Sequence, residues 1–506
     1  MSDPVPNSEK LSRFVIVGGG TAGWMTAAFL TRYFSPGQAG GTKVSITLVE
    51  SAEIGTIGVG EATIPPIRNF NHALGINEAE FIRATQGTFK LGIEFRDWTR
   101  HGHAYMHPFG YTGGKINGQS FHPFWIKARQ MGRARDFPDY SLNTLAAYAG
   151  KFDWPDANPA SPKAAMSYAY HFDAGLYAAF LRQVAESRGV ERIEATIETV
   201  RLNGEDGTVD AVLLRDGRAV TGDFFFDCSG FRALLIGEAL KVPYVDWSHC
   251  LPANRAVAVP SQKLGAPTPY TRATARPAGW QWRIPLQHRT GNGYVYASDY
   301  ISDDAAAASL LGSLDAPALS EPRFLKFTAG RRERVWVGNC LAVGLSGGFL
   351  EPLESTSIHL IQNSLTRLAT LFPTRRKDTL SSAYYNRAMA DEVDAIRDFI
   401  IFHYHVNGRE GEPLWDRLRS MAIPDSLAEK IALFKARGLT SFVGQTIFQE
   451  ENWISVMLGQ GLMPQAWDPL IDKVDEATFL AVLEQIHMDC KKTVAAMPLH
   501  EAALRH

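Results

Sequence analysis

Apolar positions near the start of the chain follow two different periods. An uninterrupted apolar run at residues 14–17 is typical of a buried strand, and residues 21–33 carry apolar side chains at helical spacing. A second apolar run at residues 44–49 predicts another strand. The pattern therefore predicts a strand–helix–strand unit at this end of the chain.

The same two periods return later in the chain. An apolar run at residues 224–226 leads into Asp227-Cys228-Ser229-Gly230, which predicts a strand that ends in a turn. Residues 335–337 lead into a glycine-rich stretch at 344–348, and helical spacing follows from about 357 to 371. These segments predict further strands of the same sheet and a helix packed beside it.

Helical spacing also marks other regions. Residues 170–188 predict one long helix, and helical patterns dominate from Ser381 onward. The alanine run 305–308 indicates a loop or the start of a helix and carries no chemistry. Two aromatic-rich stretches, 65–162 and 242–322, have the composition of loop-rich insertions. They predict a second module that is threaded through the first.

The fold class that follows is α/β, with a Rossmann-like module, an interleaved second module and an α-helical C-terminal layer. A length of 506 residues allows two to four domain-sized units. We expect the nucleotide-binding module to comprise residues 10–64, 163–241 and 323–372. The second, substrate-binding module then comprises residues 65–162, 242–322 and 373–506.

Composition and charge exclude several classes of protein. A hydrophobic share of 45% and a charged share of 21% are ordinary for a globular protein. The net charge of −2 gives no electrostatic reason to bind nucleic acid or an anionic membrane. The chain lacks a signal-peptide pattern at its start and any long uninterrupted apolar window. We therefore expect a soluble cytoplasmic protein with no membrane partner.

The cysteines and histidines do not predict a metal site. Four cysteines lie far apart without a C-x-x-C spacing, which argues against a disulfide framework and a zinc ribbon. His403 and His405 are two residues apart, and this spacing does not place both rings on one helix face. We expect core or surface histidines there, and no metal ligands.

A glycine motif sits between the first predicted strand and helix. Gly18, Gly20 and Gly23, with Thr21 and Ala22 between them, satisfy G-x-G-x-x-G. Glycines permit a tight turn and the close approach of a pyrophosphate, which then lies at the positive end of the helix dipole. The motif therefore predicts a dinucleotide-binding turn.

Three further segments bear on which nucleotide binds. Glu50, at the tip of the second strand, is placed to bind the ribose hydroxyls of the adenosine. The turn alone does not separate FAD from NAD. The stretch that contains Gly58, Val59 and Gly60, and the strand end 227–230, resemble segments that run along the cofactor in flavin monooxygenase-type folds. They favour FAD.

A tryptophan motif makes the resemblance specific. Trp280, Trp282, Ile284 and Pro285 form W-x-W-x-I-P, the signature of flavin-dependent halogenases, and with the glycine turn the chain resembles that family. The likeness covers nearly the whole chain in the family's order. It continues at the segments 88–90, 107–110, 170–173, 351–356 and 459–464.

The resemblance implies an enzyme that uses reduced FAD, O2 and a halide ion, bromide or chloride, to make hypohalous acid. The family's two tryptophans are thought to separate the substrate from the flavin. Lys90 matches the lysine that receives the oxidised halogen, either as a haloamine on the neutral amine or through a hydrogen bond from the ammonium. Since an ordinary lysine has a pKa of about 10.4, the covalent route would need burial to lower it.

Four more residues take roles from the same resemblance. Glu354 matches a glutamate suited to orient the electrophile and to stabilise or deprotonate the cationic ring intermediate. Thr356 and Ser357 match the pair whose backbone amides hold the halide, and Leu345 lies where the family backbone touches the cofactor. Tryptophan-type members usually have glycine at the position of Ser357, so a side chain there is expected to alter the halide preference.

The substrate is expected to differ from free tryptophan. Residues 441–453 form a shorter segment than in tryptophan-specific members and lack the two tyrosine pairs that clamp the amino acid. We expect indole or another electron-rich aromatic, sandwiched by His107, Phe109 and Trp453.

The sequence leaves two alternative functions open and predicts one partner. The chain could instead be a flavin-dependent monooxygenase that hydroxylates an aromatic ring, or a flavin-binding protein whose catalysis has decayed. Because no second nucleotide-binding fingerprint is evident, reduced FAD is expected to arrive from a separate flavin reductase.

Overall fold

A six-stranded sheet, parallel except at one edge, contains the first predicted strand. The computed structural model describes residues 11–34, 44–51, 60–440 and 446–505. The strand order is β20-β21-β12-β1-β2-β8, and only the β20–β21 pair is antiparallel. The predicted strands near the start and at 224–226 are therefore neighbours. The six strands are β1 (Arg13–Val17), β2 (Ser45–Glu50), β8 (Glu191–Glu194), β12 (Phe224–Asp227), β20 (Trp336–Val337) and β21 (Cys340–Ala342).

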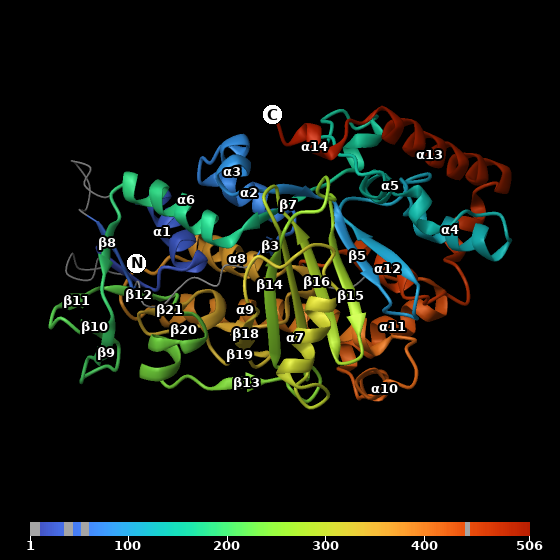
Figure 1. Cartoon of the computed structure of the whole chain (residues 1–506). Helices are drawn as coiled ribbons and strands as arrows, with labels where there is room; N and C mark the ends of the chain where they lie inside the picture. The colour runs from blue at the N-terminus through green and yellow to red at the C-terminus, as the bar shows by residue number, and fades with distance from the viewer. Residues whose placement is uncertain (1–10, 35–43, 52–59, 441–445, 506) are drawn as a thin grey trace.

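Two helices that pack on each other cover this sheet, as Figure 1 shows. Helix α1 (Thr21–Tyr33) has the predicted bounds. The prediction of one long helix at 170–188 was wrong, because this segment contains strand β7 (Ala169–Asp173) and then helix α6 (Ala174–Ser187). The carboxylate of Asp173 accepts hydrogen bonds from the amides of Gly175 and Leu176, at 3.0 and 3.1 Å, and so starts the helix there.

A seven-stranded sheet forms the centre of the molecule (Figure 1). Its order is β18-β14-β17-β16-β15-β5-β6, antiparallel except for the β15–β5 pair. The stretches 65–162 and 242–322 therefore supply strands of this sheet as well as loops. The strands are β5 (Gly92–Arg96), β6 (Ala104–Pro108), β14 (Arg255–Ser261), β15 (Thr271–Arg276), β16 (Gly279–Pro285), β17 (Thr290–Tyr296) and β18 (Arg323–Lys326).

Three smaller three-stranded sheets accompany these two. One has the order β3-β7-β4 and joins β3 (Gly60–Ala62) to β4 (Thr88–Lys90) through β7. The other two have the orders β11-β10-β9 and β13-β19-β22. Their strands are β9 (Ile197–Leu202), β10 (Val209–Leu214), β11 (Ala219–Thr221), β13 (Tyr244–Asp246), β19 (Gly330–Arg332) and β22 (Gly348–Phe349).

Helices dominate the last part of the chain, which confirms the predicted α-helical layer (Figure 1). The predicted helix at 357–371 is α8 (Ser357–Thr370), and the alanine run 305–308 lies within α7 (Asp303–Gly312). No described helix is both long and apolar enough to cross a membrane. The remaining helices are α2 (Pro66–Ala73), α3 (Glu78–Ala84), α4 (Phe121–Gln130), α5 (Leu142–Tyr148), α9 (Thr379–His405), α10 (Pro413–Ser420), α11 (Asp425–Arg437), α12 (Glu450–Gly459), α13 (Glu476–Ala496) and α14 (His500–Ala503).

Candidate active site

The glycine turn between β1 and α1 has the geometry of a pyrophosphate cradle. Gly18 has φ +109°, and a Cβ on it would lie 2.3 Å from the carbonyl oxygen of Cys228. A Cβ on Gly23 would lie 1.9 Å from the carbonyl oxygen of Gly18, so both positions require glycine. A Cβ on Gly20 would meet no atom within 4 Å, which leaves the N-terminus of α1 open to a ligand. These residues fit the pyrophosphate of a dinucleotide.

Two further segments border this turn. Glu50 ends β2, where its carboxylate accepts a hydrogen bond from Arg192 and folds over Gly19. A Cβ on Gly344 would lie 2.9 Å from the Cβ of Ala22, so the turn that carries Leu345 packs against the start of α1. The turn, Glu50 and the Leu345 segment are therefore together. Gly58 and Val59 lie outside the described residues, and Gly60 begins β3.

Lys90 ends strand β4 and is completely buried. Its ammonium nitrogen donates to the carbonyl oxygen of Thr63 at 3.0 Å and to the hydroxyl of Ser355 at 2.9 Å. The ring of Phe109 lies 5.2 Å from this nitrogen. Burial lowers the pKa of Lys90 to about 7, against an opposing effect of the negative charge on Glu354. Lys90 is therefore buried, as the covalent haloamine route requires.

Glu354 lies within the short helical turn Pro352–Glu354 and is 1% exposed. Nδ1 of His107 lies 2.9 and 3.1 Å from its two carboxylate oxygens, and Nε2 of His403 lies 2.8 Å from Oε1. Burial raises the pKa of Glu354, but the two histidines outweigh this effect and lower it to about 2. Glu354 is therefore a buried carboxylate at neutral pH.

A strained serine links the lysine and the glutamate. Ser355 has φ +60°, a left-handed conformation that is uncommon for a residue with a side chain. This backbone turns the Ser355 hydroxyl toward Lys90, while Glu354 beside it faces the histidines. Thr356 and Ser357 follow at the N-terminus of α8, and no side chain caps the first turn of this described helix. Its first amides therefore point out of the helix end unpaired by a cap.

The tryptophan motif forms strand β16, which passes all of these segments. The indole nitrogen of Trp280 donates to Oε2 of Glu351 at 2.6 Å, and the hydroxyl of Tyr404 donates to the same oxygen at 2.6 Å. At the other end of the strand, the carbonyl oxygen of Pro285 accepts from the Thr88 hydroxyl at 2.8 Å. Trp280 and Trp282 lie on one buried face, with ring centroids 6.2 Å apart. Between the ends, Ile284 packs against Gly60.

The three predicted substrate residues are all buried and fall into two groups. His107 and Phe109 contact Glu354 and Lys90 as described above. Trp453, on α12, packs instead on Phe399, with ring centroids 4.7 Å apart. The ring of Phe399 also lies 5.8 Å from that of His107, so Phe399 connects the groups.

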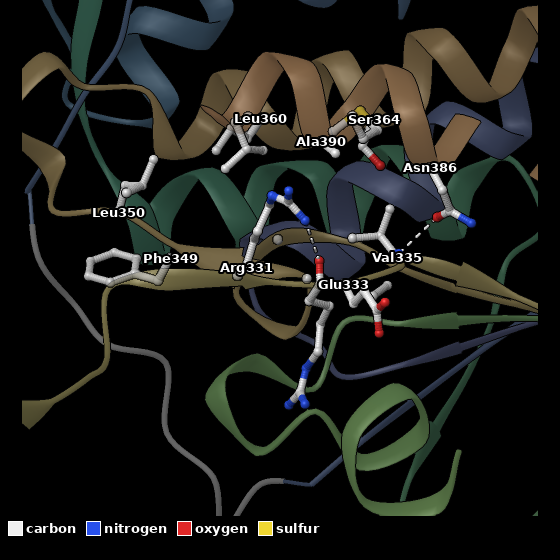
Figure 2. A pocket seen from close by; sticks show the side chains of 16 residues that line it. Arg331, Glu333, Val335, Phe349, Leu350, Leu360, Ser364, Asn386 and Ala390 are labelled. Atoms are coloured by element: carbon white, nitrogen blue, oxygen red, sulfur yellow. Dashed lines mark hydrogen bonds between the residues drawn. The ribbon is translucent and has the colours of Figure 1, made fainter. Parts of the chain in front are cut away.

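A separate pocket opens beside the Leu345 segment. Figure 2 shows it between β19, the turn that leads to Phe349 and Leu350, and helices α8 and α9. Gly344, Gly347 and Gly348 line one side of it. Lys90 and Glu354 are not among its lining residues, so this pocket borders the predicted cofactor segment and not the lysine.

Sequence reasoning missed Ser355, Glu351, Phe399 and the role of His403. The first two lie in a segment that had been noted as family-like, which was the available signal. His403 is a core histidine, one of the two placements that the sequence predicts for it, and it is buried against Glu354, whereas His405 is only partly buried. No group of metal-binding side chains occurs in the described ranges. The contacts of Phe399 depend on tertiary packing that no local pattern reports.

Comparison with known proteins gives consistent matches along the chain. A sequence profile for tryptophan halogenases matches residues 13–476. A tryptophan 6-halogenase from Streptomyces toxytricini is 36% identical over 93% of each chain. A flavin-dependent halogenase from Xanthomonas campestris is similar in structure, with a TM-score of 0.93, 48% identity and 98% of each chain covered. A flavin-dependent halogenase from Brevundimonas sp. BAL3 has a TM-score of 0.93 at 45% identity, with 98% of this chain and 99% of that chain covered.

Proposed function

The chain belongs to the tryptophan halogenase family, a family of flavin-dependent enzymes. We therefore propose that it halogenates an electron-rich aromatic such as indole, with Lys90 and Glu354 as its catalytic residues. The observation that carries this proposal is the buried lysine beside a buried carboxylate, joined through Ser355. The matches do not favour the alternative of an aromatic hydroxylase.

We propose that the Gly18–Gly23 turn, Glu50 and Leu345 hold FAD. The glycine cradle and the uncapped start of α1 suit its pyrophosphate. When bound and reduced, FAD would supply, with O2, the oxidising power that converts a halide ion to hypohalous acid. Residues 10–64, 163–241 and 323–372 remain our proposed FAD-binding module, and the rest of the chain our proposed substrate-binding module.

Lys90 is proposed to receive the halogen as a neutral amine. With a pKa of about 7, about half of the amine is neutral near pH 7 and carries a free lone pair. Attack of this lone pair on the halogen of hypohalous acid forms an N–halogen bond and breaks the halogen–oxygen bond. Hydroxide leaves and takes a proton from the nitrogen as water. The product is a haloamine that the fold holds in one place.

Glu354 is proposed to complete the substitution. The aromatic ring attacks the halogen, the N–halogen bond breaks, and the nitrogen of Lys90 keeps the electron pair and takes a proton from water, which restores the neutral amine. The hydroxide formed in this step later accepts the proton that Glu354 removes from the ring. The ring carbon then loses its proton to the carboxylate of Glu354, which restores aromaticity. A fixed negative charge also stabilises the cationic ring before that step. Glu354 suits both tasks because its pKa of about 2 keeps it ionised.

The halide is proposed to bind at the amides of Thr356 and Ser357. Helix α8 directs these amides and its positive dipole end away from the helix. They follow Ser355 directly, so a halide there lies on the same segment that bonds Lys90. Oxidised halogen would therefore start close to the lysine that receives it.

Indole, or another aromatic without an amino-acid backbone, is the proposed substrate. His107 forms a hydrogen bond with Glu354, and the ring of Phe109 lies against Lys90, so both residues border the reacting atoms. The test supplies indole and tryptophan in parallel to purified enzyme with a flavin reductase, NADH, FAD and bromide. We expect brominated indole to form faster. Faster turnover of tryptophan would contradict the substrate assignment while leaving halogenation intact.

Lys90→Ala separates halogenation from hydroxylation. A hydroxylase needs no halide and no amine, whereas the proposed reaction needs both. We expect Lys90→Ala to lose halogenated product, with exposed Lys263→Ala as the matched control that retains it. Normal product formation by Lys90→Ala, or hydroxylated product in halide-free buffer, would contradict the mechanism.

A separate flavin reductase is the proposed source of reduced FAD. Mixing the protein and FAD with NADH alone should leave the flavin oxidised, and adding a reductase should start product formation. Rapid reduction by NADH without the reductase would overturn this part of the proposal.

A further inference from the structure

His403 occupies a position that the reaction above does not use. It lies on α9 and is completely buried. Nδ1 of its ring lies 2.7 Å from the carbonyl oxygen of Phe399, and Nε2 lies 2.8 Å from Oε1 of Glu354. Both nitrogens therefore face oxygen atoms.

The hydrogen-bond partners determine where the protons of His403 lie. A carbonyl oxygen only accepts hydrogen bonds, so Nδ1 must carry a proton. In a neutral ring, Nε2 would then present a lone pair to a carboxylate oxygen at 2.8 Å, and the two would repel. Nε2 forms no well-aligned hydrogen bond among the described residues, and its distance to Oε1 is within the range of an ion pair. Repulsion is removed when Nε2 is also protonated.

His107, the other histidine on Glu354, has the opposite arrangement. The backbone amide of Gln449 donates to the side-chain oxygen of Asn452 at 2.8 Å, which fixes the orientation of that amide group. Its NH2 group therefore faces Nε2 of His107, at 3.0 Å. Nε2 must accept this hydrogen bond, so Nδ1 carries the single proton and donates it to Glu354.

We infer that His403 is a positioning residue that is held as a doubly protonated imidazolium. Its positive charge neutralises Glu354, so Lys90 does not have to act as the counter-ion of Glu354. The two hydrogen bonds of Lys90 agree with this, because both go to uncharged oxygens, of Thr63 and Ser355. A neutral amine has two N–H groups, so these bonds use both and leave the lone pair available.

Other titratable groups around the pair are consistent with a cation at His403. Glu351 adds a second buried carboxyl group near its ring, and this group already accepts from Trp280 and Tyr404. The hydroxyl of Tyr105, on β6, interacts with Glu354 and stays neutral, because burial raises its pKa. The remaining titratable groups near His403 and Glu354 are Lys90, on β4, and His107, on β6. Without a charged His403, two carboxyl groups would share this interior with Lys90 as the nearest cation.

Nitrogen NMR of protein with 15N-labelled histidine tests the charge directly and does not depend on turnover. An ordinary histidine has a pKa of about 6.5 and is neutral at pH 8. We expect one imidazolium at pH 8 whose signals vanish in His403→Asn and become those of a neutral ring in Glu354→Gln. Absence of an imidazolium at pH 8, or its survival in His403→Asn, would overturn the inference. This result stands or falls independently of the halogenase proposal.

A pH profile tests the consequence for Lys90, and this part rests on the proposed function. His403→Gln keeps a neutral N–H donor near Glu354 but removes the charge. Lys90 then becomes the counter-ion, so we expect the acidic limb of the bromination rate to move up by one pH unit or more, a tenfold loss at low pH that higher pH restores. The matched control is His487→Asn, since His487 is a buried histidine on α13 that bonds a backbone carbonyl. An unmoved limb in His403→Gln, or an equal shift in the control, would overturn the role.

Discussion

The indole nitrogen of Trp280 lies 2.6 Å from Oε2 of Glu351, three residues before Glu354. This contact ties the central strand of the molecule to the turn that carries the carboxylate. We expect Trp280→Phe to lower the free energy of unfolding by about 1–3 kcal/mol, because it leaves a buried carboxyl group short of one donor. Chemical denaturation measures this change. Trp282→Phe keeps the Glu351 bond and serves as the control; an equal loss there would assign the effect to ring packing.

Gly20→Ala separates ligand contact from folding at the glycine turn. A methyl group at Gly20 meets no protein atom within 4 Å, so the free energy of unfolding should change by less than about 0.5 kcal/mol. If a pyrophosphate lies against this glycine, the same methyl group should weaken FAD binding about tenfold or more. Flavin fluorescence titration measures the affinity. Unchanged affinity would place the pyrophosphate elsewhere.

Gly18→Ala is the paired variant in which folding itself should fail. Its methyl group would clash with the Cys228 carbonyl at a φ of +109°. We expect a lower thermal midpoint even without FAD. Equal thermal midpoints for Gly18→Ala and Gly20→Ala would show that the backbone of the turn adapts.

The buried lysine should cost stability in a pH-dependent manner. Its pKa is about 7 in the folded protein and 10.5 in the unfolded chain, so between these values the unfolded state binds more protons. The folded state therefore loses stability as pH falls from 10.5 toward 7. We expect Lys90→Met to stabilise the fold at pH 7.5 by up to about 4 kcal/mol, with a smaller gain at pH 10, while product formation is lost. Denaturation at both pH values tests this; a gain that is independent of pH would contradict it.

Ser357→Gly should change which halide is used. Chloride is the smaller ion, and a glycine lets it approach the first amides of α8 more closely than the serine side chain does. We expect a several-fold rise in the ratio of chlorinated to brominated product when both halides are present at equal concentration. Mass spectrometry of the products measures the ratio. A ratio that does not change would remove Ser357 from the halide site.

Local sequence patterns predicted the nucleotide-binding turn and most of its surroundings. Periodicity predicts helix α1 and the strand near residue 224, because the helix packs on the six-stranded sheet and the strand belongs to it. Periodicity did not predict the segment 170–188 correctly, because the short strand Ala169–Asp173 is buried on both faces and runs directly into a helix. The N-cap Asp173 was the local signal that separated them. Here a buried strand and a buried helix have the same apolar composition.

Sequence motifs supplied some residues of the candidate site but not their arrangement. Lys90 and Glu354 came from motifs, yet their environments depend on partners 247 residues away in the case of His107 and Glu354. The proton positions on His403 follow from the Phe399 carbonyl and the Glu354 carboxylate together. Such a contact requires α9 to pack on the turn before α8, which no short segment encodes.

Helix α9 places Phe399, which touches Trp453 and His107, one turn before His403. An engineered change to the ring contacts of Phe399 therefore also affects the contact between His403 and Glu354. A bulky or helix-bending replacement at 399 displaces the carbonyl that holds Nδ1 of His403. Libraries aimed at larger aromatic compounds should therefore vary Phe448, whose ring stacks on Phe399 at 3.9 Å, and leave residues 399 and 403 unchanged.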